Sequence, residues 1–252
     1  MEVVTLSNQK GGVGKTTTAF HLATGLYGTG KRVLLVDLDA QTNLAFTAGV
    51  DLMSLETTLY DVFRKQAAVH DAVMPLKAGF DILVGGLDLT AADMEFTAVG
   101  REYMLSESLE PLQDEYDYCI IDTPPTLGVL TMNALTASDK VIIPIQADAY
   151  SLQGMQQLSG FIGNVQKYSN KGLVVDGLLI TRYDSRTAIT KALDEQIRVI
   201  ADSMGTKVYN AKIRNTVNVA KAALLQTDLY SLDSKNTASL DYMEFVQEFL
   251  AD

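Results

Sequence analysis

Short apolar runs rich in β-branched residues recur along the chain and alternate with segments of helical spacing. The runs occupy residues 3–7, 32–39, 80–85, 117–123, 140–146, 174–182 and 207–213. Several are apolar throughout, which is typical of strands covered on both faces. We therefore predict seven strands in a mostly parallel sheet.

Three other segments carry apolar side chains at the i, i+3, i+4 spacing of a helix that buries one face. They are Ala19, Leu22, Ala23, Leu26 and Tyr27; Ile189, Ala192, Leu193, Ile197 and Ile200; and Tyr242, Met243, Val246, Phe249 and Leu250. Alternating strands and helices predict an α/β fold, a twisted sheet with helices on both faces. No repeat or Pro/Gly-rich linker divides the chain, so we expect one domain over residues 1–252.

Composition excludes several classes of protein. The chain has 252 residues, 47% of them hydrophobic, and no apolar run approaches the roughly 18 residues of a membrane span. Cys119 is the only cysteine, which excludes a disulfide within the chain, and the two histidines lie far apart. We expect a cytoplasmic protein with no membrane attachment and no zinc site.

The net charge of −11 is unevenly distributed. Residues 167–221 contain ten Lys and Arg against five Asp and Glu, a net charge of +5, so the remainder carries −16. The ordinary interpretation of such a tract is a solvated surface of mixed charge. The alternative is a contact with nucleic acid.

The stretch NQKGGVGKTT, residues 8–17, follows the first predicted strand and opens the first predicted helix. A glycine loop at this place gathers free backbone N–H groups at a helix N-terminus, which suits phosphate. The expected phosphate-binding residues of the loop are Gly11, Gly12, Val13, Gly14, Lys15, Thr16 and Thr17. Lys15 would reach the β and γ phosphates, and the Thr16 hydroxyl would coordinate Mg²⁺. Gln9 stands where the strict pattern GxxxxGK[ST] has its first glycine.

Two more predicted strands end in carboxylates. LLVDLDAQ contains Asp37 and Asp39, and CIIDTPP contains Asp122. Ligands of α/β sheets bind beyond the carboxyl ends of the strands, so we expect all three carboxylates near the phosphates, with Mg²⁺ among them. A single aspartate at a strand end is often only a helix cap, but the set indicates nucleotide chemistry.

The motifs KGGVGKTT, VLLVDLDAQ, IIDTPP and PIQADAYSLQGMQQL resemble the deviant Walker A ATPases of the ParA/MinD superfamily, most closely the ParA/Soj group. The resemblance covers nearly the whole chain and is weakest between residues 50 and 110. It implies a single-domain P-loop NTPase that binds ATP or ADP with Mg²⁺ and hydrolyses ATP.

The resemblance implies a role for the additional lysine of the loop, here Lys10. In the family this lysine contacts the nucleotide phosphates of the neighbouring subunit, so ATP joins two monomers in a sandwich dimer. Lys15 is assigned to phosphate binding in its own subunit. Asp39 is assigned to positioning the attacking water, with Asp37 beside it.

Further site residues follow from the same resemblance. Thr16 is assigned to Mg²⁺, and Asp122 matches the Walker B aspartate, which usually reaches the ion through water. Relatives contact adenine from loops after late strands. TRYD at residues 181–184 and IRNTV at residues 213–217 are the corresponding places, and we select Asn215.

The resemblance also implies partners. ATP-bound ParA/Soj dimers bind DNA without sequence preference, and the tract at residues 167–221 could supply the equivalent surface. The candidate DNA-binding residues are Arg186, Lys191, Lys212, Arg214 and Lys221. We expect a nucleoid-associated ATPase that partitions a plasmid or chromosome and leaves DNA when a ParB-like partner stimulates hydrolysis.

Two alternatives stay open. One is a related ATPase that positions another cargo, such as a protein organelle or a chemotaxis cluster, on the nucleoid. The other is a metabolic P-loop enzyme. A MinD-like membrane helix is not expected, because the chain ends in the acidic LDYMEFVQEFLAD, and an iron–sulfur reductase needs more cysteines than Cys119.

Overall fold

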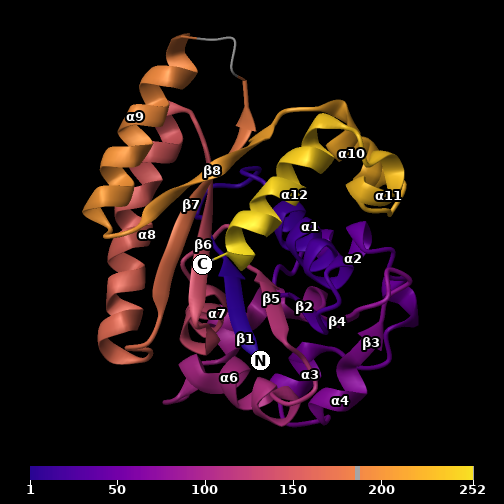
Figure 1. The fold of residues 1–252 in the computed structure, drawn as a ribbon. Helices are drawn as coiled ribbons and strands as arrows, with labels where there is room; N and C mark the ends of the chain where they lie inside the picture. The colour runs from indigo at the N-terminus through magenta and orange to yellow at the C-terminus, as the bar shows by residue number, and fades with distance from the viewer. Residues whose placement is uncertain (185–187, 252) are drawn as a thin grey trace.

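One mostly parallel sheet organises the molecule. The computed structural model describes residues 1–184 and 188–251, without the side chains of residues 149–153 and 188–192. Within this part of the chain eight strands lie in the order β3-β4-β2-β5-β1-β6-β7-β8 (Figure 1). Their bounds are β1 Glu2–Leu6, β2 Val33–Asp37, β3 Val73–Pro75, β4 Asp81–Val84, β5 Tyr118–Asp122, β6 Lys140–Gln146, β7 Val174–Tyr183 and β8 Lys207–Arg214.

The seven predicted strands are all present, and their ends lie within two residues of the predicted ends. They pair with one another in parallel. The edge strand β3, which pairs antiparallel with β4, was not predicted. Its three residues are too few to show a periodic pattern, and one of them is Pro75, which lacks the N–H group that a ladder requires.

The described helices differ widely in length. Their bounds are α1 Lys15–Gly28, α2 Asn43–Thr47, α3 Leu59–Phe63, α4 Val69–Ala72, α5 Ala92–Glu95, α6 Met104–Leu109, α7 Val129–Ala137, α8 Ala149–Tyr168, α9 Ala188–Ser203, α10 Val217–Leu224, α11 Leu229–Asp233 and α12 Thr237–Leu250. The three helices predicted from apolar spacing are α1, α9 and α12. The helical segments of residues 43–112 are short helices and 3₁₀ turns, which leave no long apolar stripe in the sequence.

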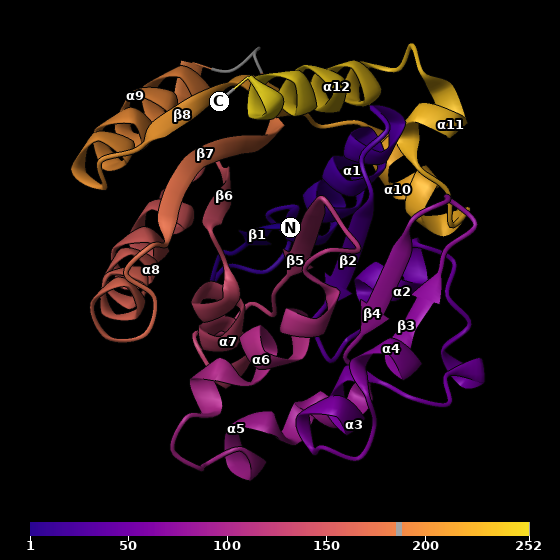
Figure 2. The same cartoon turned by 60° about the horizontal axis from the view of Figure 1, so that its bottom comes forward.

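Helices cover both faces of the sheet, as predicted. Because neighbouring strand residues point to opposite faces, Val4 and Leu6 pack with α1 and α12, whereas Val3 packs with α6 and α7. A further buried cluster joins β6 and β7 to α8 and α9. Figure 2 shows α1 and α12 on the side of the sheet opposite to α6 and α7.

The parallel register places the predicted site residues at one edge of the sheet. Leu6, the last residue of β1, pairs with Asp122 of β5, and Asp37 of β2 pairs with the same residue. The glycine loop leaves β1 at this edge and leads into α1. The strand ends thus bring the loop and two aspartates together.

Candidate functional site

The glycine loop leaves the start of α1 open to an anion. Gly12 and Gly14 have φ angles of 76° and 86°, a left-handed conformation that glycine adopts without strain. Gly14 is the N-cap of α1 and provides no side-chain cap for the first N–H groups of the helix. Such N–H groups, together with the positive end of the helix dipole, favour a phosphate.

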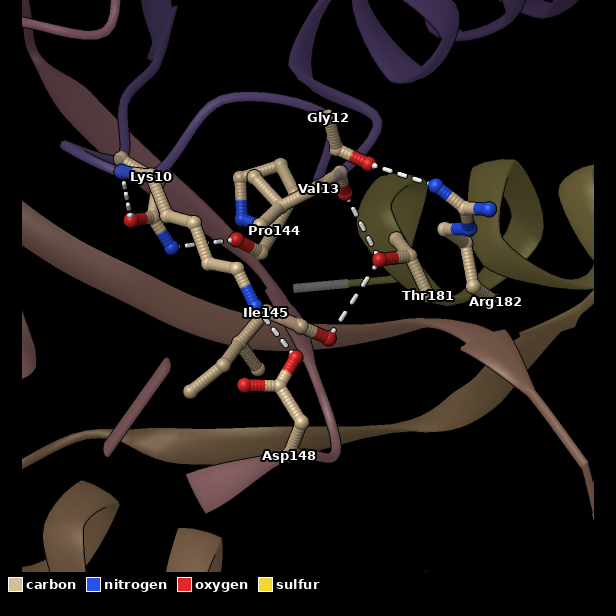
Figure 3. A network of polar contacts seen from close by, with 9 residues as sticks. Lys10, Gly12, Val13, Pro144, Ile145, Asp148, Thr181 and Arg182 are labelled. Atoms are coloured by element: carbon tan, nitrogen blue, oxygen red, sulfur yellow. Dashed lines mark hydrogen bonds and ion pairs between the residues drawn. The ribbon is translucent and has the colours of Figure 1, made fainter. Parts of the chain in front are cut away.

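Hydrogen bonds to neighbouring strands hold the loop in place (Figure 3). The Asn8 side-chain amide donates to the Pro144 carbonyl at 2.8 Å and accepts the Lys10 backbone N–H at 2.9 Å. On the other side of the loop, the Thr181 hydroxyl donates to the Val13 carbonyl at 2.7 Å. The ends of β6 and β7 therefore preorganise the backbone that would surround the phosphates.

Two cations beside the loop make contacts within the subunit (Figure 3). The Lys10 ammonium group forms an ion pair with Asp148, and the two side chains are 31% and 27% exposed. The Arg182 guanidinium donates through Nη1 to the Gly12 carbonyl at 3.3 Å. Lys10 is thus held in its own subunit in this structure.

Lys15, Thr16 and Asp122 meet at the base of the loop. Burial lowers the pKa of Lys15, while the charges of Asp122 and Asp39 oppose that shift. The Thr16 hydroxyl donates to Asp122 Oδ2 at 2.6 Å. Burial raises the pKa of Asp122 to about 7, against the opposing effects of the Thr16 hydrogen bond and the Lys15 charge.

The oxygen atoms of Thr16 and Asp122 fit a magnesium ion. Asp122 Oδ1 is buried and has no hydrogen-bond partner within the described residues. Oxygen donors are the ligands that Mg²⁺ prefers. No group of three His, Cys, Asp or Glu side chains in the described part of the chain has the arrangement of a metal site, although Asp37 and Asp122 are paired across β2 and β5. The expected place of Mg²⁺ near the three carboxylates therefore stays a prediction.

Asp37 and Asp39 differ in what their carboxylates contact. Asp37 is fully buried, and its two oxygens accept the backbone N–H groups of Asp39 at 3.1 Å and Ala45 at 2.9 Å. Burial, reinforced by the charge of Asp122, raises the pKa of Asp37 well above its usual range. Asp39 is only half-buried and accepts the Gln41 N–H at 3.0 Å. Asp37 therefore holds the chain after β2, and Asp39 is the more accessible of the two.

A cavity of about 310 Å³ adjoins the glycine loop. Gly12 and Thr17 line it from the loop and α1, Arg182 from the end of β7, and Asn215 from the segment between β8 and α10. Its volume is at the lower end of the range for small-molecule sites. Asn215 therefore lies at a cavity beside the glycine loop, and its contact with adenine stays a prediction.

Two charged side chains at the loop, Asp148 and Arg182, were not predicted. Both lie in motifs that the sequence shows, PIQADAYSLQGMQQL and TRYD. Their contacts with the loop depend on β6 lying next to β1, and on β7 lying next to β6. Motif spacing alone does not give that strand order.

Two of the candidate DNA-binding residues already make strong contacts within the subunit. The Arg214 guanidinium donates through Nε and Nη2 to the carboxylate of Asp241, which is buried. The Lys212 ammonium group pairs with Asp194 and lies 4.8 Å from the centre of the Tyr183 ring. These charges are largely balanced by their partners.

The other three DNA-binding candidates differ in how much of each the structure describes. Lys221 is exposed on α10. Lys191 belongs to α9, but its side chain is outside the described part of the structure, and Arg186 lies outside the described residues. The DNA-binding surface therefore stays a prediction, with Lys221 as its best-placed described residue.

Two structural findings bear on the alternatives raised by the sequence. Cys119 is fully buried in β5, where burial raises the pKa of its thiol, so it packs as a small apolar side chain. Among the helices of the described residues, none combines the length and apolar character needed to cross a membrane.

The chain is similar to known proteins over its full length. A family model described as AAA domain matches residues 1–175. The sporulation initiation inhibitor protein Soj of Bacillus subtilis is 36% identical over 253 residues, which cover 100% of this chain and 99% of Soj. The chromosome partitioning protein ParA of Caulobacter vibrioides is 36% identical over 255 residues, with coverage of 100% and 94%.

Structures of cobyrinic acid a,c-diamide synthase from Mycobacterium smegmatis, bound to ADP or an ATP analogue with magnesium, are also similar. They have TM-scores of 0.87 and 0.88, with 34% identity and coverage of 99% of this chain and 94% of theirs. The glycine loop, Lys10 and the two strand-end motifs thus belong to a chain that matches Soj over 99% and ParA over 94% of their lengths. The chain belongs to the ParA/Soj family of P-loop partitioning ATPases.

Proposed function

We propose that this chain is a Mg²⁺-dependent ATP hydrolase that partitions DNA, and that ATP joins two copies of it in a sandwich dimer. The observation that carries the proposal is the convergence of Lys10, Lys15 and the Thr16–Asp122 pair on one glycine loop. The similarity to Soj and ParA supports the partitioning role. The similar structures with bound nucleotide and magnesium support the cofactors.

The residues of the loop would bind and polarise the nucleotide. Lys15 is 7% exposed, so its positive charge would act on the phosphates with little screening by water. Thr16 would hold Mg²⁺ directly and Asp122 would hold it through water, and the bound ion would neutralise phosphate charge. Asn215 would contact the adenine in the adjoining cavity.

Asp39 would position the water that attacks the γ phosphate. The Gln41 N–H fixes one of its oxygens and leaves the half-buried carboxylate able to accept a hydrogen bond from water. Asp37 would support this arrangement, because its carboxylate binds the Asp39 N–H. The two aspartates therefore contribute differently, one to water and the other to backbone geometry.

Lys10 would couple nucleotide binding to association. In the described subunit its ammonium group pairs with Asp148. To reach the phosphates of a partner subunit, the lysine must leave this carboxylate. ATP carries more negative charge than ADP, so ATP favours the move of Lys10 from Asp148 to the phosphates. Dimerisation is then sensitive to whether the nucleotide carries a γ phosphate.

The dimer would bind DNA through basic side chains of both subunits. In the described part of the tract at residues 167–221, Lys212 and Arg214 are paired with carboxylates, and a second copy would double the basic side chains that remain. Each contact between a basic side chain and a DNA phosphate releases counterions, and the contributions of several contacts to the binding free energy add up. A ParB-like partner that accelerates hydrolysis would return the protein to monomers and release it from the nucleoid.

The decisive experiment measures binding of the protein to random-sequence duplex DNA, with Mg²⁺ and ATP, ADP or no nucleotide, at two salt concentrations. We expect binding only with ATP, weaker at the higher salt concentration. The Lys10→Ala variant should bind ATP as a monomer but fail to bind DNA. Absence of DNA binding in protein that demonstrably binds ATP would refute the partitioning role.

A metabolic function is the second candidate, because two structures that are 34% identical to this chain bear the name of a diamide synthase. This candidate predicts ATP-dependent amidation of a small carboxylic acid and no ATP-dependent binding to DNA. The DNA-binding experiment therefore separates the two functions. Positioning of another cargo predicts the same DNA binding, but a cargo adaptor in place of a ParB-like partner.

A further inference from the structure

Thr181 and Arg182, at the end of β7, both contact the glycine loop. The Thr181 hydroxyl donates to the Val13 carbonyl, and the Arg182 guanidinium donates to the Gly12 carbonyl (Figure 3). Consecutive residues of a regular strand point to opposite faces of the sheet. One of these two side chains would therefore point away from the loop if the strand remained regular.

The backbone at Arg182 departs from regular strand geometry. Its φ angle is 51°, a left-handed conformation that is unfavourable for a residue with a Cβ atom. The pairing of β7 with β8 also shifts register between Ile180 and Tyr183. This local distortion turns Arg182 towards the loop, and strained backbone of this kind is concentrated at binding and catalytic sites.

Arg182 lies at the cavity beside the glycine loop. Arg182 is exposed and lines the cavity of about 310 Å³ together with Gly12, Gly14 and Thr17, the residues around the phosphate cradle. A guanidinium group has five N–H donors in a planar fork, which matches phosphate oxygens. The neutral Gly12 carbonyl accepts one of these donors at 3.3 Å, a long hydrogen bond.

We propose that Arg182 is a further nucleotide-binding residue, which contacts the phosphates of ATP bound in the same subunit. The inference rests on the proposed nucleotide site but goes beyond the lysines of the loop. Arg182 would approach from the end of β7, whereas Lys15 lies buried beneath the loop and Lys10 is held at Asp148. The phosphates would then contact Lys15 from helix α1 and Arg182 from the end of β7.

The test is equilibrium binding of fluorescent ATP and GTP analogues by Arg182→Asn, at protein concentrations low enough to keep the chain monomeric. Asparagine tolerates the left-handed backbone conformation, so this variant removes the cation and spares the turn. We expect roughly tenfold weaker binding of both nucleotides, because a charge-assisted hydrogen bond is lost. Arg182→Lys should recover part of the affinity, since it restores the charge without the fork.

Arg198→Asn is the matched control. Arg198 is an exposed arginine on α9 that does not line the cavity, so its replacement should leave nucleotide affinity unchanged. Wild-type affinity in a folded Arg182→Asn variant would overturn the proposal, and so would a loss confined to ATP, which would indicate a contact with the base. Failure of the wild-type protein to bind ATP would instead refute the nucleotide site itself.

Discussion

Lys10 forms an ion pair with Asp148 in the free subunit, and in the proposed ATP dimer it would have to leave this carboxylate for the phosphates of the partner. Asp148→Asn should weaken the contact within the subunit and leave Lys10 available to a partner. A partly exposed pair contributes about 1 kcal/mol, so roughly fivefold less protein should suffice for half-maximal dimerisation. Light scattering over a protein dilution series with saturating ATP and Mg²⁺ measures this concentration.

Asp202→Asn is the control for the change in net charge, because Asp202 is exposed on α9. Its dimerisation should match that of the wild-type protein. Lys10→Ala should fail to dimerise with either aspartate or asparagine at position 148. If Asp148→Asn required as much protein as the wild type or more, Asp148 would not compete with the partner subunit.

The accessible carboxylate of Asp39 leads to a specific expected effect of its mutation on hydrolysis. Asp39→Ala should bind ATP and accumulate as the ATP dimer, with hydrolysis slower by a factor of about 100 or more, because no carboxylate would position water. Single-turnover hydrolysis together with light scattering measures both effects. Wild-type turnover in this variant would show that another group positions the water.

At the level of elements, the sequence predicted structure best where the signal was local. Unbroken apolar runs identified the central strands, and the glycine-rich stretch located the loop between β1 and α1. The three-residue β3 and the short helices of residues 43–112 gave too few periods to be recognised. Asp148 and Arg182 were missed because their contacts depend on strand order and, for Arg182, on a left-handed turn.

Helix α1 connects the nucleotide site to the C-terminal helices through His21, which is buried. One ring nitrogen, Nδ1, lies 2.7 Å from the Thr17 carbonyl, and the other accepts the Leu229 backbone N–H at 3.0 Å. The ring also stacks on Tyr242, with 4.9 Å between ring centres. These contacts require a neutral imidazole that carries its proton on Nδ1, and a second proton would break the bond from Leu229.

The burial of a neutral His21 between α1 and the C-terminal helices predicts a loss of stability in mild acid. Burial lowers the pKa of His21 from 6.5 to about 4, although the Thr17 carbonyl and Asp228 partly oppose this shift. The other titratable side chains facing the ring are Tyr230 and Tyr242, and burial raises the pKa of both phenols. As the pH falls from 6.5 to about 4, the imidazole of the unfolded chain binds a proton, whereas that of the folded chain stays neutral. The free energy of unfolding therefore decreases by about 3 kcal/mol.

Denaturant unfolding at pH 7 and pH 4 measures this effect as a difference between the wild type and His21→Gln. The variant has no imidazole to titrate, and the contributions of other groups cancel in the comparison. The stability gap between the two proteins should narrow towards pH 4, because only the wild type loses this contribution. A gap that does not change with pH would show that His21 does not control acid stability.

For the molecule as a whole, the structure reduces the amount of basic charge available to DNA. The tract at residues 167–221 has a net charge of +5 in the sequence, but Lys212 and Arg214 are paired with carboxylates. Arg214 holds the buried Asp241 and thereby joins β8 to α12. We therefore expect these two basic residues to stabilise the fold, and Lys221 to contribute to binding of DNA.

Lys221→Gln and Arg214→Gln separate these two roles. Lys221→Gln should weaken DNA binding by the ATP dimer and lower the magnitude of the slope of log K against log salt by about 2, because one phosphate contact is lost in each subunit. Arg214→Gln should instead lower the free energy of unfolding by about 1 kcal/mol, since it removes the fork that satisfies Asp241. Its folded ATP dimer should retain the wild-type salt slope. If the two variants exchanged these effects, the DNA surface would lie along β8, and the Arg214–Asp241 pair would have to open when DNA binds.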